Sequence, residues 1–155
     1  MNTRCTSPMK TTHFIPISAY LLLAACSKHG ATLNDPKADR LEGTWNCGSA
    51  IVDGKALSDD TIKQLHLTLT ESRYKTEEKD EVLFDSTYTT NASMNPMQIN
   101  MVGTEGDLTG KEAQGIYLIQ GDILRICYTM PGDRRPEKFE STSGSKAYLV
   151  VWKRE

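Results

Sequence analysis

The sequence has few of the residues that build catalytic or metal-binding sites. Its three histidines are well separated, and it shows neither a nucleophile beside a base, nor metal-ligand spacing, nor a phosphate-binding glycine loop. His29 falls in a polar stretch without a second ligand, and His66 is expected on the exposed face of a strand. We therefore predict that the protein is not an enzyme and that it holds no cofactor and no metal.

The chain also lacks a large excess of charge of either sign. Its formal net charge is -2 over 155 residues, and it contains no basic stripe and no basic helix. Nucleic-acid-binding domains usually carry such a basic surface, so we expect no nucleic-acid partner. The acidic cluster at 77–81 is typical of a solvated turn. The length predicts one domain with a single core.

Long apolar runs are scarce, and the apolar stretch at 14–25 is shorter than the roughly 20 residues that a membrane-spanning helix needs. It is uncharged, follows basic residues and precedes a polar stretch, which is the layout of a secretory signal. It leads into the sequence LAAC, which resembles the lipobox of bacterial lipoproteins. We predict a signal peptide over 1–25, with Met9 as a second possible start, and lipidation of Cys26. A plain signal peptide or a buried apolar helix is the alternative.

Residues 26–40 are expected to form the lipid anchor and a flexible tether. The segment is small, polar and aperiodic until Asp35-Pro36, where a short helix is expected to start. The expected location is the cell envelope, with the protein held on a membrane by its N-terminal lipid. Because Ser27 rather than an aspartate follows the cysteine, the resemblance to sorted lipoproteins favours the periplasmic face of the outer membrane.

Residues 41–155 consist mainly of short β-type runs separated by turn residues. The clearest pair lies at 115–130, where Gly121 begins a two-residue loop and permits the positive φ of a type II′ turn. This turn sets a register that places Tyr117, Ile119 and Tyr128 on the core face of the hairpin.

About eight such strands, with one or two short helices, predict an all-β antiparallel barrel or sandwich. Both faces of the last run, 147–154, are apolar, so its facing stays open. Two-residue alternation elsewhere predicts a set of core-facing residues. In chain order these are Trp45, Cys47, Ile51, Leu65, Leu67, Leu69, Val82, Phe84, Tyr88, Met97, Ile99 and Met101.

Motifs along the domain resemble lipocalin-like proteins. Gly43-Thr44-Trp45 opens the first strand and Lys153-Arg154 ends the last, similar to the lipocalin pattern of a tryptophan covered by a cation. Nearly the whole domain is similar to an uncharacterised lipocalin-like family, found largely in planctomycetes and other environmental bacteria, through LEGTW, NPMQINM, GIYLIQGDILRICY, RRPEKF and VVWKR. The resemblance implies a lipocalin-like β-barrel over 41–155 and carries over no catalytic residue.

Several residues are candidates for particular roles in such a barrel. The resemblance implies that Trp45 and Arg154 close one end. Arg135 belongs to an RP-x-x-F motif and is expected either to close a barrel end or to contact a ligand, since arginine pairs well with carboxylates. Met97 and Met101 share an inward face, where they serve as flexible core or line a ligand pocket.

Cys47 and Cys127 are the cysteines that remain in the mature domain. An oxidising envelope favours a disulfide between them. Strict alternation places their side chains on opposite faces of the sheet, which opposes a bridge, whereas a bulge near Gly48 can turn Cys47. The sequence leaves this pairing open.

Two functional hypotheses follow. The first is a membrane-anchored lipocalin-like module that binds a small, mainly apolar ligand inside the barrel. The second is an envelope protein-interaction or inhibitor module that acts through barrel loops such as 131–144. An open cavity favours the first, and a filled barrel with an exposed apolar loop patch favours the second. Catalysis is a third class, for which no constellation of residues is visible.

Lipidation gives the first testable prediction. Changing Cys26 to Ser removes the thiol that would carry the lipid, so the protein should leave the membrane fraction and lose labelling by a fatty-acid analogue. Cys5→Ser, upstream of the predicted cleavage site, is the matched control and should change neither readout. Unchanged membrane association of the Cys26 variant would contradict the lipoprotein hypothesis.

Overall fold

The computed structural model describes residues 40–155. The predicted signal peptide, Cys26 and most of the tether lie outside these residues. Residues 40–42 have no helical structure, and the rest of the helix expected after Asp35 also lies outside the described range. Between residues 40 and 155 no helix has the length and apolarity that crossing a bilayer requires.

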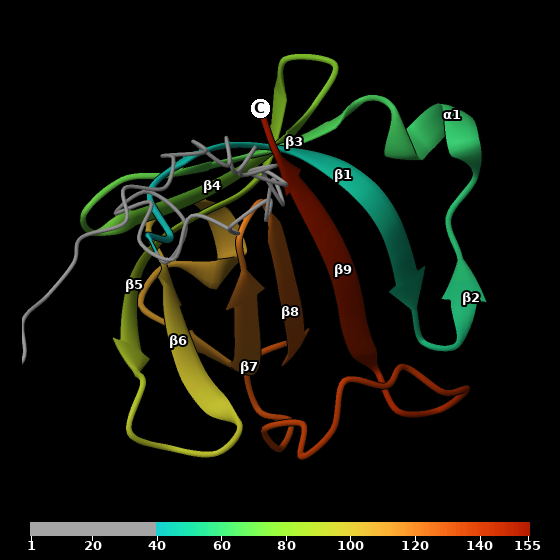
Figure 1. The fold of residues 1–155 in the computed structure, drawn as a ribbon. Helices are drawn as coiled ribbons and strands as arrows, with labels where there is room; N and C mark the ends of the chain where they lie inside the picture. Colours follow the sequence, from blue (N-terminus) through green and yellow to red (C-terminus); the bar gives the residue numbers. More distant parts are fainter. Residues whose placement is uncertain (1–39) are drawn as a thin grey trace, which may run out of the picture. The chain divides into compact units, whose positions relative to one another are not determined.

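Eight antiparallel strands form a closed barrel (Figure 1). Each strand pairs with the next along the chain, and the last returns to pair with the first, so that β9 lies between β8 and β1. The barrel strands are β1 (Gly43–Val52), β3 (Leu65–Leu69), β4 (Arg73–Glu78), β5 (Glu81–Asn91), β6 (Met97–Gly103), β7 (Glu112–Gln120), β8 (Ile123–Thr129) and β9 (Ala147–Arg154). The predicted all-β lipocalin-like barrel is confirmed, because closure excludes the sandwich.

Three short elements accompany the barrel. β2 (Lys55–Ala56) forms a hairpin with the end of β1, and α1 (Asp59–Ile62) follows it at the side of the barrel (Figure 1). The Ser58 side chain caps α1 by accepting a hydrogen bond from the Thr61 N–H at 3.3 Å. A 3-10 turn, η1 (Gly106–Leu108), lies between β6 and β7.

The β7–β8 hairpin has the register predicted from its turn. Gly121 has a φ of 58°, as the first loop position of a type II′ turn requires. Tyr117 pairs with Ile126 and Ile119 pairs with Leu124. Three of these side chains are buried in the main core and Ile119 packs against it, so this face is the core face.

A β-bulge in β1 overturns one predicted facing. Cys47 pairs with Trp152 but Ser49 pairs with Val151, so Gly48 is an extra residue in β1. The extra residue shifts the alternation, and Ala50 rather than Ile51 enters the core. Cys47 precedes the bulge and still packs against the core. The inward facing expected for Ile51 is therefore wrong.

A second bulge, in β5, has the same effect on Val82. Phe84 pairs with Thr76 and Val82 with Glu77, which leaves Leu83 as the extra residue. Phe84 packs against the core as expected, but Val82 is exposed. The inward facing expected for Val82 is wrong because the bulge reverses alternation on its side.

The last strand, whose facing the sequence left open, turns Val150 and Trp152 into the core. Its other face belongs to a second cluster on the outside of the barrel, formed by the buried residues Ile116, Cys127 and Ala147 with Phe139 and Leu149 packed against them. Phe139 comes from the β8–β9 loop, so this outer cluster anchors that loop against the barrel wall.

One end of the barrel is closed around Trp45, which is fully buried. The Arg154 guanidinium carbon lies 4.0 Å from the centroid of the Trp45 ring, a cation–π contact. The Trp45 indole N–H donates to the Leu41 carbonyl at 3.0 Å. Arg154 donates to the carbonyls of Glu42 at 2.9 Å and Arg40 at 2.6 Å. Residues 40–42 are thereby tied across this end.

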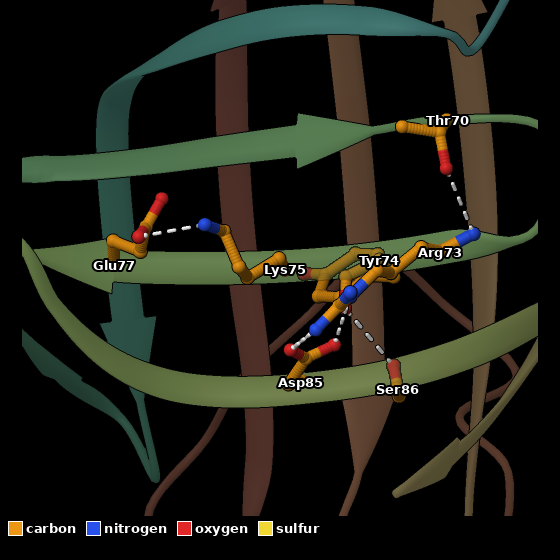
Figure 2. A network of polar contacts seen from close by, with 7 residues as sticks. All are labelled: Thr70, Arg73, Tyr74, Lys75, Glu77, Asp85 and Ser86. Carbon is orange, nitrogen blue, oxygen red and sulfur yellow. Dashed lines mark hydrogen bonds and ion pairs between the residues drawn. The ribbon is translucent and has the colours of Figure 1, made fainter. Parts of the chain in front are cut away.

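A polar network joins β4 to β5 on the barrel surface (Figure 2). The Arg73 guanidinium donates two hydrogen bonds to the Asp85 carboxylate, one of them from Nε at 2.8 Å. The Asp85 side chain is only 2 % exposed, so this pair supplies the partner that a buried carboxylate needs. The hydrogen bonds from Arg73 lower the pKa of Asp85, while burial opposes the shift. Lys75 and Glu77 form a second pair at 2.8 Å.

The closed end gives a prediction about stability. Replacing Trp45 by Ala removes a buried ring and its contact with Arg154, and should lower the free energy of unfolding by about 3–5 kcal/mol. Trp45→Phe keeps a ring under Arg154 and should cost less. Urea denaturation of the three proteins measures the difference, and nearly equal stabilities would contradict this account of the closed end.

The Arg73–Asp85 pair gives a prediction about acid stability. Because the pKa of Asp85 is lowered in the folded protein, its ionised form stabilises the fold above the unfolded carboxyl pKa of about 3.9. That stabilisation is lost as the pH falls through the folded pKa. Asp85→Asn should therefore melt lower than wild type at pH 7, with the gap shrinking below about pH 4. Glu77→Gln removes the partly exposed pair with Lys75 and should have a smaller effect than Asp85→Asn, because the Asp85 side chain is far more buried.

Candidate ligand-binding site

An apolar cavity of about 220 Å³ lies at the barrel end opposite Trp45. It is lined by residues from the end of β1, the start of β3 and the β8–β9 pair, and it extends inward as far as Trp152, two residues before Arg154 on β9. We call it the mouth cavity, and its walls include Ala50, Leu65, Phe84, Tyr128, Tyr148 and Trp152.

Irregular segments of the chain bring three leucines to this cavity. The Leu57 N–H donates to the Ala50 carbonyl at 2.9 Å, which holds the segment before α1 against β1. Leu83 reaches the cavity from the β5 bulge. Leu108 comes from η1, which approaches Gly103 so closely that a Cβ there would lie 2.3 Å from the Leu108 carbonyl oxygen. Glycine at 103 therefore permits this approach.

The walls of the mouth cavity carry no charged side chain, and Thr76 is the one aliphatic hydroxyl among its lining residues. Tyr128 and Tyr148 stack against each other, with ring centroids 5.0 Å apart and an angle of 12° between the planes. Burial raises the pKa of Tyr128, so its phenol stays protonated at neutral pH. The cavity therefore offers an uncharged, partly aromatic surface.

A second cavity, of about 490 Å³, lies near the closed end. Its walls include Tyr88, Met97, Tyr117 and Ile119, but also the charged residues Arg40 and Glu42. Although it is larger, it borders the segment that Arg154 holds through backbone carbonyls. The mouth cavity is the better candidate site because apolar walls with few polar groups are typical of ligand pockets.

The three residues predicted to contact a ligand do not meet at the mouth cavity. Met101 is fully buried in the core and Met97 lines the second cavity. Arg135 donates to the backbone carbonyls of Ile99 at 3.0 Å and Gly115 at 2.5 Å, and to the Asn100 side-chain oxygen at 2.6 Å. These bonds attach the β8–β9 loop to β6 and β7, so the guanidinium serves the scaffold.

Both cysteines of the described chain are free thiols. Cys47 packs against the main core, whereas Cys127 belongs to the outer cluster and donates to the Glu140 carbonyl at 3.4 Å. Burial raises the pKa of Cys47 to about 11 and also raises that of Cys127. Neither thiol is activated as a nucleophile, since reactive cysteines have lowered pKa values.

His66 lies exposed on β3, as predicted, and its Nδ1 is 2.9 Å from the Asn46 side-chain oxygen. Across residues 40–155, no group of three or more metal-ligating side chains is close enough to hold an ion.

Sequence reasoning placed some walls of the mouth cavity and missed others. The hairpin register had put Tyr128 on the core face. Leu57, Leu83 and Leu108 lie in irregular segments, where alternation gives no direction for a side chain. The glycine at 103 was a visible sign of close packing, but it does not identify the segment that approaches it.

Three comparisons with known proteins identified no relative of this chain. No family model matches this chain, and neither the curated proteins nor the solved structures contain a significant match to it.

Proposed function

We propose that the chain is a membrane-anchored bacterial lipoprotein whose lipocalin-like barrel binds a small, mainly apolar ligand in the mouth cavity. The observation that carries the proposal is a cavity with apolar, uncharged walls at the barrel end opposite the Trp45–Arg154 contact. Transfer of an apolar ligand from water into such walls is favourable in proportion to the apolar area that is buried. The N-terminal lipid at Cys26 would hold this site at the cell envelope.

The filled barrel centre limits where a ligand can bind. Trp45, Tyr74, Met101 and Trp152 are each at most 2 % exposed, and together they occupy the region below the mouth. A ligand therefore enters from the open end and stops above these side chains, instead of running through the barrel. This depth favours a small ligand over a long lipid.

One observation favours the second hypothesis, an interaction module. Val82 and Leu83 are 48 % and 53 % exposed at the β4–β5 hairpin, beside the mouth. Exposed apolar side chains that lie together are typical of protein-interaction surfaces. In that case the mouth rim would contact another envelope protein.

Native mass spectrometry of the full chain, purified from its own host, distinguishes the two hypotheses. The ligand hypothesis predicts a retained small molecule. Ala50→Leu adds volume inside the mouth cavity and should reduce the retained mass signal at least several-fold. Ala92→Leu, which alters the second cavity, is the matched control and should retain it.

A retained protein partner that survives Ala50→Leu but is lost in Leu83→Asp would instead favour the interaction module. Leu83 is more than half exposed, so this second variant should fold normally. Retention of the small molecule by Ala50→Leu and its loss in Ala92→Leu would place the ligand in the second cavity and contradict the proposal.

A further inference from the structure

The β5–β6 hairpin is an uncharged projection from the closed end of the barrel (Figure 1). Residues 86–104, which cover the second half of β5, the loop and all of β6, include no acidic side chain, no basic side chain and no histidine. Pairing of β5 with β4 ends at Thr87, whereas β5 stays paired with β6 as far as Asn91. The hairpin therefore extends past its neighbour β4, and Met94 in its loop is 45 % exposed.

The loop of this hairpin lies beside the point where the chain enters the barrel. Residues 40–42 line the second cavity together with Ala92 and Met97, which stand on either side of the loop tip. In the sequence, residues 27–39 link this segment to Cys26, the predicted lipidation site. Fully extended, that link spans at most about 50 Å. This reach allows either end of the barrel to meet the membrane, so the surfaces of the two ends decide between them.

An apolar surface continues from the loop into the second cavity. The walls of this cavity carry Met97 and Ile119 together with two tyrosines, Tyr88 and Tyr117. The Tyr88 hydroxyl donates to the Thr70 carbonyl at 2.8 Å, so its polar atom has a partner. Tyrosine combines an apolar ring with a polar tip and is enriched where proteins meet the membrane interface. This composition suits a boundary between water and hydrocarbon.

The exposed apolar residues of the mouth end have acidic neighbours. Val82 is 48 % exposed, close to the value for Met94. Residues 77–81, which directly precede Val82, comprise four acids and one lysine, and one of these acids pairs with Lys75. Moving a charged side chain from water toward hydrocarbon is costly unless the charge is paired. The mouth end is therefore the less favourable of the two ends for contact with a bilayer.

The charged residues of the closed end limit such a contact to the hairpin tip. Arg40 and Glu42 lie 3.7 Å apart and balance each other. Glu71 and Asp122 are exposed on the turns to either side of the hairpin, and Asp122 lies 3.5 Å from the Arg154 guanidinium. Because the hairpin extends past β4, its loop can meet a bilayer while Glu71 stays in water.

We infer that the loop of the β5–β6 hairpin, residues 92–96, contacts the bilayer that holds the Cys26 lipid, with Met94 at the boundary between headgroups and hydrocarbon. This inference rests on the proposed lipid anchor and specifies how the barrel is oriented on it. Because the anchor keeps the barrel at the membrane, a weak apolar contact is enough to favour one orientation. The mouth cavity then faces away from the bilayer, so its ligand arrives from the aqueous side.

Methionine methyl resonances test this orientation in the unaltered sequence. The lipidated full chain, labelled with ¹³C at its methionine methyl groups, is placed in phosphatidylethanolamine–phosphatidylglycerol nanodiscs whose lipids carry a headgroup nitroxide. Intensities are compared before and after the nitroxide is reduced with ascorbate. The nitroxide should remove most of the Met94 intensity but little from Met130, which lines the mouth cavity. Full intensity at Met94, or a loss at Met130 as large as that at Met94, would overturn the inference.

Two variants matched in exposure test whether the loop itself makes the contact. Met94→Glu and Val82→Glu each place a charge at a position that is nearly half exposed, so both should fold normally. In Met94→Glu the broadening of the Met97 methyl, beside the loop, should fall several-fold because the charged loop withdraws from the bilayer. Val82→Glu changes the mouth end and should leave the broadening of Met97 as it is in wild type. Equal responses of Met97 in the two variants would contradict a contact through the loop.

Fractionation of wild type separates this inference from the proposed lipid anchor. Absence of the wild-type protein from the membrane fraction would overturn the anchor, and with it the orientation. Wild type that stays in the membrane fraction but shows no broadening at Met94 would overturn the orientation alone and leave the anchor intact.

Discussion

The pairing of β1 with β9 is the constraint on which the rest of the structure depends. It turns a meander of strands into a closed barrel, and it brings Arg154, at the end of the chain, over Trp45, near its start. Closure leaves the two barrel ends chemically different. One end is sealed by an indole, a guanidinium and the backbone of residues 40–42. The other end, without such a seal, holds the mouth cavity.

Departures from regular strand geometry decide which side chains line the mouth cavity. Without the bulge at Gly48, the larger Ile51 would face inward near the position that Ala50 now occupies. The bulge in β5 likewise brings Leu83 to the cavity. Bulges redirect side chains at barrel rims, and here they place Ala50 and Leu83 at the mouth cavity.

Several residues on the outer face of the barrel belong to a motif that, judged from the sequence alone, suggests a functional site. Arg135 donates hydrogen bonds to backbone carbonyls of β6 and β7 and to a side-chain amide oxygen of β6. Phe139 packs into the outer cluster with Cys127. These contacts fix the long β8–β9 loop to the barrel wall. These motif residues therefore hold the scaffold together.

The sequence by itself determined the features that depend on neighbouring residues: the β7–β8 register set by a two-residue turn, the alternation of Leu65, Leu67 and Leu69 in β3, and the Ser58 cap of α1. The resemblance to lipocalin-like proteins predicted the closed barrel end, in which Trp45 lies under Arg154. Tertiary structure alone decided the bulges, the inward face of β9 and the leucines around the mouth. A bulge is defined by the pairing of two strands, and the facing of a strand that is apolar on both sides depends on which neighbours cover it, so neither is encoded in local alternation.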